Sequence, residues 1–404
     1  MYYCSEIIIL MNSNHFFVWM LTLSLLCANL AVTAQNDTIP FLYRGHLYVN
    51  ATINDTISLG IIYDTGASDH FGVDSVWLAH SDWTPTDMGT ARSGGGAGYM
   101  TVPLILDSTK VNIGTIQEQY AMVPVFKLRD VLDCHLDGIS GIKGITDHPL
   151  EINFEQNLMI KHKNGLPDTK GYQQIPIRYE NTRILLQVET NIGGTLVKGW
   201  YLMDTGSGGT VTFTAQATSL FQLDTISGKR YISDVTQNGL GDKKQEYYVS
   251  MMPDHIIIGS DTIFERPISY IPEGVGALGY AKYLGVIGNG IWSRYNIIID
   301  VENEVLYLRR FKEFTPPIPT YDYTFRNRTD ICKGWVVSGL IRAGDAVSAG
   351  MALGDTIISI NGRNVTDYSW DEEWDIDTIP MQVLDIIGID GSEKRITIAA
   401  KRLW

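Results

Sequence analysis

The pattern of apolar and polar residues predicts two similar β-hairpins, placed about 140 residues apart in the chain. The first is expected over residues 47–53 and 59–63, and the second over residues 185–190 and 200–203. In each hairpin the second apolar strand runs directly into the tripeptide Asp-Thr-Gly, at residues 64–66 and 204–206. The chain therefore contains an internal repeat that places the same short polar motif after the same predicted element.

The repeat continues beyond the two motifs. Its matching segments are 138–141 with 285–288, 152–160 with 299–307, and a glycine-rich tip at 94–99 with a second tip at 238–242. Residues 152–160 and 299–307 each predict a strand, a polar turn and a strand, whereas residues 73–80 predict a short helix. A repeat of this length is too long for a solenoid unit, so we expect two lobes of a duplicated, mainly β fold.

A proline-rich stretch around 314–319 predicts a linker, and a third module is expected after it. This module should contain short strands at 335–340 and 356–360, a turn at Asn361-Gly362 and a final hairpin near 390–391. The expected division is a leader over 1–34, lobes over 41–165 and 172–312, a linker over 313–320, and a small α+β domain over 321–404.

The N-terminus predicts a signal peptide. Residues 16–30 are apolar, and small residues at 31–34 provide a cleavage site before Gln35. The apolar run is short for a membrane-spanning helix. No Lys or Arg precedes it, which leaves Met11 open as the true start, and Leu26 before Cys27 argues against a lipoprotein. We expect an exported protein of a Gram-negative bacterium, in the periplasm, in the cell envelope or secreted.

The chain is acidic, with 31 Lys and Arg against 45 Asp and Glu, and a net charge of −14. This charge argues against nucleic-acid and anionic-lipid partners and leaves peptides or proteins as the expected ones. Cys134 and Cys332 are the two cysteines beyond the leader and are predicted to be unpaired, buried thiols. No His-Glu-x-x-His spacing occurs, and the acidic run at 371–377 lacks the glycine and final glutamate of a calcium loop. We therefore expect no metal and no cofactor.

The duplicated motif points to hydrolysis by paired carboxylates. One ionised carboxylate can take a proton from water while a protonated partner donates one, which is the general acid–base chemistry that amide hydrolysis requires. Two carboxylates held about 3 Å apart cannot both ionise, so such a pair retains one proton. Asp64 and Asp204 are the candidate pair. Threonine hydroxyls beside them can lock the two loops together, and the glycines permit close backbone approach.

The segments Asp-Thr-Gly-Ala-Ser at 64–68 and Asp-Thr-Gly-Ser-Gly at 204–208 resemble the active-site loops of pepsin-like and retropepsin-like aspartic proteases. The resemblance covers roughly residues 41–311 and implies a bilobal β fold that cleaves extended peptides, with both aspartates in one chain so that a monomer suffices. It implies catalysis by Asp64 and Asp204, loop support by Thr65, Gly66, Ser68, Thr205, Gly206 and Ser207, and a substrate-covering flap at Gly96, Gly98 and Tyr99.

One departure from this family changes the expected pH behaviour. Ala67 stands where pepsin-like enzymes usually place a hydroxyl on the first aspartate, whereas Ser207 can supply one to Asp204. Because such a hydrogen bond lowers a carboxyl pKa, we expect the pair to hold its proton to higher pH than a site with two hydroxyls. The expected optimum is mildly acidic to near neutral.

The third module resembles a bacterial PDZ domain, on the run at 349–365 and the preceding strand at 334–340. PDZ domains bind a peptide as an added strand and hold its C-terminal carboxylate on backbone N–H groups. The resemblance implies such a site at Lys333, Gly334, Trp335 and Val336. Two alternatives stay open: a catalytically silent peptide-binding or scaffold protein, and a PDZ fold that serves only in packing.

Overall fold

We describe the protein from a computed structural model that covers residues 36–67, 70–141, 145–237, 239–242, 247–274, 276–280 and 282–404. The expected leader at 1–34, with Met11 and Cys27, and the candidate residue Ser68 lie outside the described residues. The fold is mainly β, with 46% strand and 11% helix in two sheets, which confirms the predicted class. Among the described residues, no helix has the length and apolar character needed to cross a bilayer.

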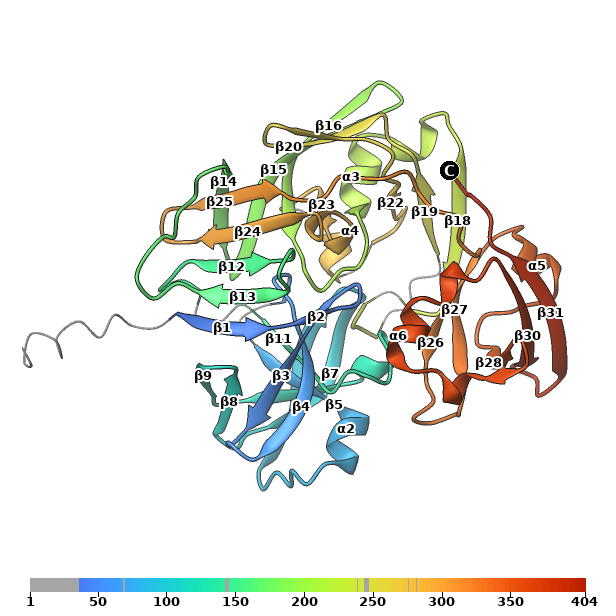
Figure 1. Cartoon of the computed structure of the whole chain (residues 1–404), viewed down its shortest axis with the longest axis horizontal. Coiled ribbons are helices and arrows are strands. Elements are labelled where there is room, and N and C mark those ends of the chain that lie inside the picture. Colours follow the sequence, from blue (N-terminus) through green and yellow to red (C-terminus); the bar gives the residue numbers. More distant parts are fainter. Residues whose placement is uncertain are drawn as a thin grey trace, which may run out of the picture.

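A ten-stranded sheet is built from the N-terminal segment, defined here as residues 41–165 (Figure 1). Its strands are β2 (Leu42–Tyr43), β3 (Leu47–Ile53), β4 (Ile57–Tyr63), β5 (Phe71–Asp74), β6 (Met88–Gly95), β7 (Gly98–Ile105), β8 (Thr109–Ile113), β9 (Ile116–Tyr120), β10 (Val123–Phe126) and β11 (Gly138–Ser140), with α2 (Ser75–His80) and the short helix η1 (Leu128–Asp130). Their order is β6-β7-β10-β5-β11-β4-β3-β8-β9, and β2 pairs with β3.

Helix α2 begins later than the sequence predicts, because Val73 and Asp74 complete strand β5. The Asp74 carboxylate accepts hydrogen bonds from the N–H groups of Val76 and Trp77, at 2.7 and 3.0 Å. These two N–H groups have no partner within the helix, so the carboxylate satisfies them and fixes the start of α2.

The middle segment, defined here as residues 172–312, repeats the pairing of the N-terminal segment. Its elements are β14 (Gln173–Glu180), β15 (Arg183–Ile192), β16 (Thr195–Met203), β17 (Val211–Phe213), α3 (Ala215–Leu220), η2 (Leu223–Thr225), β18 (Arg230–Val235), β19 (Tyr247–Met251), β20 (His255–Ile258), β21 (Asp261–Ile263), β22 (Ile268–Tyr270), η3 (Gly276–Gly279), β23 (Gly285–Ile287), α4 (Asn289–Trp292), β24 (Tyr295–Asp300) and β25 (Val305–Arg310). Strand β23 lies parallel to β16 and antiparallel to β17, as β11 does to β4 and β5. Likewise β22 lies parallel to β17, as β10 does to β5. The predicted internal repeat is therefore present in the strand pairing.

Six antiparallel strands join the N-terminal and middle segments. They follow the order β1 (Asp37–Pro40), β13 (Leu158–Lys161), β12 (Leu150–Asn153), β24, β25 and β14. Ile152 of β12 pairs with Ile297 of β24, and both side chains are fully buried. The turns after β12 and β24 carry Asn157 and Glu304 in the left-handed region, at φ 56° and 54°. Both predicted strand-turn-strand segments are confirmed, and they meet side by side.

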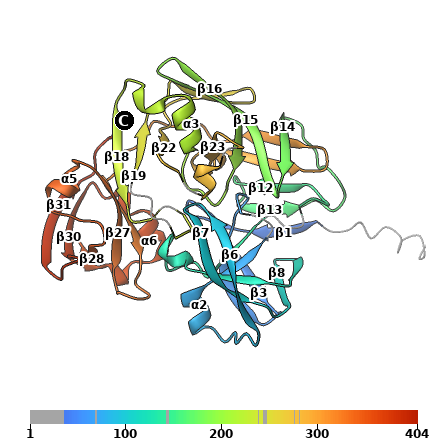
Figure 2. The same ribbon diagram turned by 180° about the vertical axis from the view of Figure 1, so that it is seen from behind.

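The C-terminal segment, defined here as residues 321–404, has its own buried core and is joined to the middle segment by strand pairing. Its elements are β26 (Tyr323–Asn327), β27 (Trp335–Ile341), α5 (Asp345–Ser348), β28 (Thr356–Ile360), β29 (Arg363–Asn364), η4 (Val365–Asp367), α6 (Trp370–Trp374), η5 (Ile376–Thr378), β30 (Met381–Ile387) and β31 (Glu393–Ala399). Strand β18 pairs antiparallel with β27, so the two segments share a sheet (Figure 2). The predicted Asn361-Gly362 turn joins β28 and β29, with both residues at positive φ.

Candidate active site

The two Asp-Thr-Gly loops leave buried strands and are supported by matching backbone bonds. Asp64 follows β4, and its N–H donates to the carbonyl oxygen of Ser140 in β11 at 2.9 Å. Asp204 follows β16, and its N–H donates to the carbonyl oxygen of Ile287 in β23 at 3.0 Å. The segments at 138–141 and 285–288, which match each other in the repeat, thus lie behind the loops and support them in the same way.

Two buried threonines hold the loops together by reciprocal hydrogen bonds. The Thr65 N–H donates to Thr205 Oγ1, and the Thr205 N–H donates to Thr65 Oγ1, both at 3.0 Å. Each hydroxyl also donates across the interface, from Thr65 to the Met203 carbonyl at 3.0 Å and from Thr205 to the Tyr63 carbonyl at 2.8 Å. Both hydroxyls are therefore satisfied as donor and acceptor, which ties each loop to the strand that carries the other.

Each motif glycine lies against the aspartate of the opposite loop. A Cβ atom added to Gly66 would overlap the Asp204 carboxyl group, and one added to Gly206 would overlap the Asp64 carboxyl group. The two carboxyl groups are thus held in a space that only glycine leaves open. The structure brings Asp64 and Asp204 together from strands of two different segments.

We expect Gly66→Ala and Gly206→Ala each to lower the free energy of unfolding by about 1–3 kcal/mol, because a methyl group forced into a filled space displaces its neighbours. Any catalytic rate should fall by a larger factor than the loss of stability alone explains, since the added methyl group displaces a carboxyl group directly. Gly208→Ala is the matched control, because its added Cβ would have its nearest neighbours at 3.8 Å. Thermal unfolding of the three variants measures the difference, and equal effects at all three positions would contradict this account.

The environment of Asp204 favours its protonated form. Surrounding protein atoms desolvate its carboxyl group, and the charge and hydrogen bond of Asp64 act in the same direction, so its pKa lies well above the ordinary value. The N–H groups of Gly206 and Ser207 oppose this shift. Asp64 Oδ1 accepts the N–H groups of Gly66 and Ala67 at 2.7 and 3.1 Å. The pair can therefore hold a single proton between its two carboxyl groups.

Ser207 supports Asp204 through its backbone and not through its hydroxyl, contrary to the sequence prediction. Its N–H group lowers the pKa of Asp204, whereas its hydroxyl oxygen faces Gly288, 2.8 Å from where a Cβ of that glycine would lie. Ala67 offers Asp64 the equivalent N–H group. The two loops therefore bind their carboxylates alike, and the side chains at 67 and 207 do not distinguish them.

The two glycine-rich hairpin tips meet each other. The Ala97 N–H, between β6 and β7, donates to the Leu240 carbonyl at 2.7 Å, and the Asp242 N–H donates to the Tyr99 carbonyl at 3.4 Å. Leu240 and Asp242 belong to the tip between β18 and β19, as the repeat predicts. The two segments therefore contribute one hairpin each to a shared contact.

Tyr99, which the resemblance places in a substrate-covering flap, has its side chain at the surface of the hairpin. Its side chain is 62% exposed, with the Arg92 guanidinium 4.3 Å from the ring centre. Neighbouring Gly98 and Met100 are buried, and Met100 packs in a cluster with Tyr48. Because side chains alternate along β7, the inner face of the hairpin is presented by Met100 and not by Tyr99.

Two residues near the loops, Asn289 and His46, belong to no recognised motif, and the sequence did not identify them as site residues. Asn289 is fully buried, and its Nδ2 donates to the carbonyls of Thr205 at 2.7 Å and Gly45 at 2.8 Å. His46 makes a hydrogen bond to the Gly206 backbone; desolvation lowers its pKa, against the opposing effects of Asp133 and Asp64. The one feature of the sequence that could have identified Asn289 as a site residue is its position directly after the segment at 285–288.

The expected peptide-binding strand at Lys333, Gly334, Trp335 and Val336 is not available for strand addition. Trp335 pairs with Asn327 on one side and Ile357 on the other, and Val336 is likewise paired on both sides. Trp335 is fully buried and stacks on Phe325 with ring centres 4.5 Å apart. The prediction is wrong for this strand, because both of its edges are already used within the segment.

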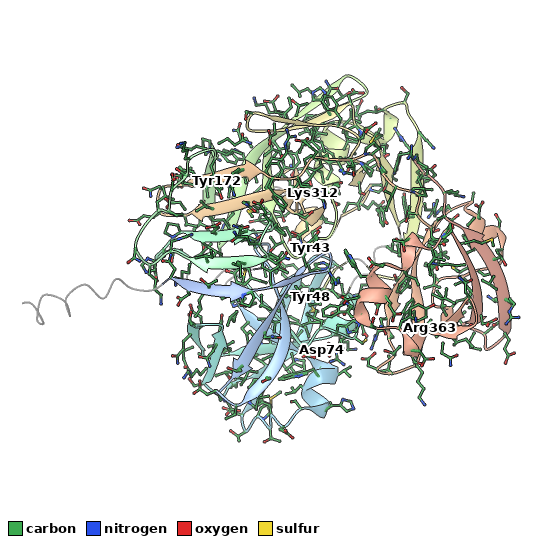
Figure 3. All side chains as sticks on the ribbon, in the orientation of Figure 1. Tyr43, Tyr48, Asp74, Tyr172, Lys312 and Arg363 are labelled. Atoms are coloured by element: carbon green, nitrogen blue, oxygen red, sulfur yellow. The ribbon has the colours of Figure 1, made fainter. Side chains whose placement is uncertain are left out.

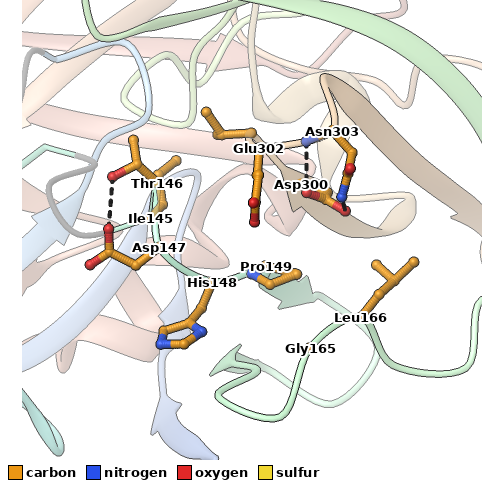
Figure 4. Close-up of a pocket in the computed structure, with 11 residues that line it drawn as sticks. Ile145, Thr146, Asp147, His148, Pro149, Gly165, Leu166, Asp300, Glu302 and Asn303 are labelled. Carbon is orange, nitrogen blue, oxygen red and sulfur yellow. Dashed lines mark hydrogen bonds between the residues drawn. The ribbon is translucent and has the colours of Figure 1, made fainter.

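The thiols and a separate pocket lie apart from the paired aspartates. Cys134 and Cys332 are unpaired as predicted, but neither is buried, because Cys134 is partly exposed and Cys332 is exposed. A cavity of 280 Å³ is lined by residues 145–149, 165–166 and 300–303, none of them a predicted site residue (Figure 4). Its Asp300 carboxylate accepts the backbone and side-chain N–H groups of Asn303. Within the described residues, no cluster of three metal-ligating side chains is found.

Comparison with known proteins adds no family name to this geometry. The chain matches no protein-family model, and no curated protein matches it.

Proposed function

We propose that this protein is an aspartic endopeptidase with Asp64 and Asp204 as its catalytic pair. The observation that carries the proposal is the meeting of two Asp-Thr-Gly loops, each glycine against the opposite carboxyl group and each threonine bonded to the other loop. The elevated pKa of Asp204 beside Asp64 supports it, because hydrolysis by paired carboxylates needs one protonated and one ionised group.

The proposed reaction divides acid and base roles between the two aspartates. Asp64, as the carboxylate, takes a proton from a water molecule whose oxygen attacks the scissile carbonyl carbon, while Asp204 donates its proton to the carbonyl oxygen. In the resulting tetrahedral diol, Asp64 gives its proton to the amide nitrogen as the C–N bond breaks. Asp204 recovers a proton from the diol hydroxyl as the carboxylic acid product forms. The pair thereby returns to its starting protonation.

The contact between the two hairpin tips supports the proposal that the substrate is enclosed during the reaction. We propose that the two tips close over a bound substrate, and that the contacts of Ala97 with Leu240 and of Tyr99 with Asp242 separate to admit an extended peptide. Lids of this kind exclude water and hold the substrate in place. The resemblance of the C-terminal segment to PDZ domains stays a sequence-based proposal that this segment binds peptide or protein termini. Such binding cannot occur by strand addition at Trp335 and Val336, because both edges of that strand are already paired.

A statine-type transition-state analogue separates the enzyme from a catalytically silent peptide-binding protein. We expect it to inhibit cleavage of a denatured protein substrate and to stabilise the chain, by about 2.7 kcal/mol at a hundred times its dissociation constant. Asp204→Asn should bind it more weakly, because the analogue hydroxyl takes the place of the water between the carboxyl groups. Stabilisation without any cleavage of the protein substrate would instead favour the silent binding protein.

A further inference from the structure

The turn between β2 and β3, residues 43–46, is bonded to the loop that carries Asp204. Asn289 links the two, because its Nδ2 donates to both the Gly45 and the Thr205 carbonyls. The Tyr43 hydroxyl donates to the Asn289 carbonyl at 3.4 Å, and His46 bonds to the Gly206 backbone. The turn is therefore attached to the Asp204 loop at two successive residues, 205 and 206.

The same turn also contacts helix α6 of the C-terminal segment. The Trp374 ring lies 3.5 Å from where a Cβ of Gly45 would be, and Gly45 is in the left-handed region at φ 73°. The Trp374 ring meets the Tyr43 ring edge-on at 6.4 Å, and the Arg44 guanidinium lies 5.9 Å from the Trp374 ring centre. Arg44 also forms an ion pair with Asp371 of α6. The turn is thus held between α6 and the Asp204 loop.

Helix α6 is itself fixed on the N-terminal segment. Trp370 stacks on His135 with ring centres 4.5 Å apart and meets Tyr48 edge-on at 4.7 Å. Glu373 accepts from His135 Nε2 at 3.1 Å and from Asn327 Nδ2 at 2.6 Å. Tyr43 and Tyr48 both lie where the three segments of the chain approach one another (Figure 3). These contacts give Trp374 a fixed position from which to support the turn.

We propose that Trp374 is a positioning residue for the catalytic pair. It acts through the turn at 43–46 and Asn289 to hold the Asp204 loop against the Asp64 loop, and this inference rests on the proposed peptidase function. The displacement needed is small, because a misplacement of about 1 Å at reacting groups can reduce a rate about a hundredfold. The C-terminal segment thus forms part of the machinery that sets the geometry of the aspartates.

Trp374 can be changed without removing a core residue of its own segment. Its side chain is 47% exposed, and the buried core of residues 321–404 is built around Trp335, Ile357 and Leu384 instead. Truncation of a half-exposed ring should therefore leave the C-terminal segment folded. The effect of the change should appear at the turn, where the ring makes its close contact with Gly45.

The test uses full-length Trp374→Ala and a short quenched-fluorescence peptide that the wild-type chain cleaves. We expect kcat to fall at least about tenfold while KM changes less than about twofold, because the ring positions the aspartates and does not contact a short substrate. Trp374→Phe should recover most of the loss by refilling the contact with Gly45. Phe264→Ala is the matched control, because Phe264 is a 56% exposed aromatic of the middle segment outside the turn contacts.

Two results would overturn the inference. One is an unchanged kcat in Trp374→Ala, and the other is an equal loss in Phe264→Ala. A double variant with Asn289→Ala adds a second test: two changes in one chain of contacts should cost less together than the sum of their separate effects. The outcome stays distinct from that of the proposed function, which fails if Asp64→Asn and Asp204→Asn still cleave the peptide. Loss of cleavage in those two with wild-type activity in Trp374→Ala removes this inference alone.

Discussion

Asp64→Asn and Asp204→Asn are each expected to lower the rate of peptide cleavage by at least about 10²–10⁴-fold, the range that a positioned acid or base contributes. The amide has the shape of the carboxyl group it replaces, so the threonine bonds between the loops should persist. At position 64 the change removes the base that accepts the proton of water. At position 204 it removes the acid that protonates the carbonyl oxygen.

The two variants should differ in stability although both are inactive. The pKa of Asp204 is raised in the folded protein, so folding takes up a proton at any pH between the unfolded and folded values. Above the ordinary pKa of an aspartate, the need to take up this proton lowers the free energy of unfolding. The loss grows as the pH rises towards the pKa of Asp204 in the folded state. Asparagine does not ionise, so the Asp204→Asn variant folds without taking up this proton. Asp204→Asn should therefore be more stable than the wild type near neutral pH, and this advantage should vanish below about pH 4, where the unfolded carboxyl group is also protonated.

Thermal unfolding as a function of pH, run beside cleavage of a denatured protein, measures both effects. Asp300→Asn serves as the matched control, because Asp300 is a buried aspartate at the end of a strand but lies outside the catalytic loops. It should retain cleavage and lose stability, since its carboxylate accepts two N–H groups of Asn303. Wild-type turnover in either catalytic variant would refute the assignment of the pair.

The sequence predicted the repeated elements because their signals are local. The strand at 47–53 and the Asn361-Gly362 turn depend on alternation and backbone preference within a few residues. The pairing of Asp64 with Asp204 was predictable for a different reason: duplication placed one motif at the same position twice. Two copies of one unit, brought together by a shared sheet, put the same loop at one interface.

The sequence could not predict contacts that arise only when separate segments meet. Trp374 lies against Gly45, far away along the chain, and nothing in either local pattern indicates that contact. The same limit affected the predicted binding strand, because whether Trp335 has a free edge depends on where β26 and β28 pair. Side-chain direction at a single position was also inaccessible, as Tyr99 and the Ser207 hydroxyl show.

The pH dependence of cleavage should follow the single proton of the aspartate pair. We expect activity to peak at mildly acidic to near-neutral pH, and the raised pKa of Asp204 favours retention of the shared proton to a higher pH than an ordinary aspartate would allow. Above the higher apparent pKa of the pair, the second carboxyl group ionises and the rate should fall about tenfold per pH unit. This alkaline limb reports how strongly the two carboxyl groups repel each other when both are ionised.

Two substitutions test whether contacts between the loops or side-chain hydroxyls determine the pH at which the alkaline limb falls. Ala67→Ser should leave it in place, because backbone N–H groups already serve both aspartates and the equivalent Ser207 hydroxyl faces Gly288. Thr205→Val should lower kcat and move the limb to lower pH. It removes the acceptor of the Thr65 N–H and the donor to the Tyr63 carbonyl, so the loops separate and the carboxyl groups repel each other less. A pH–rate profile of both variants decides between the two causes. A shifted limb in Ala67→Ser with an unshifted one in Thr205→Val would show that the hydroxyl at position 67, and not the spacing of the loops, determines how long the pair keeps its proton.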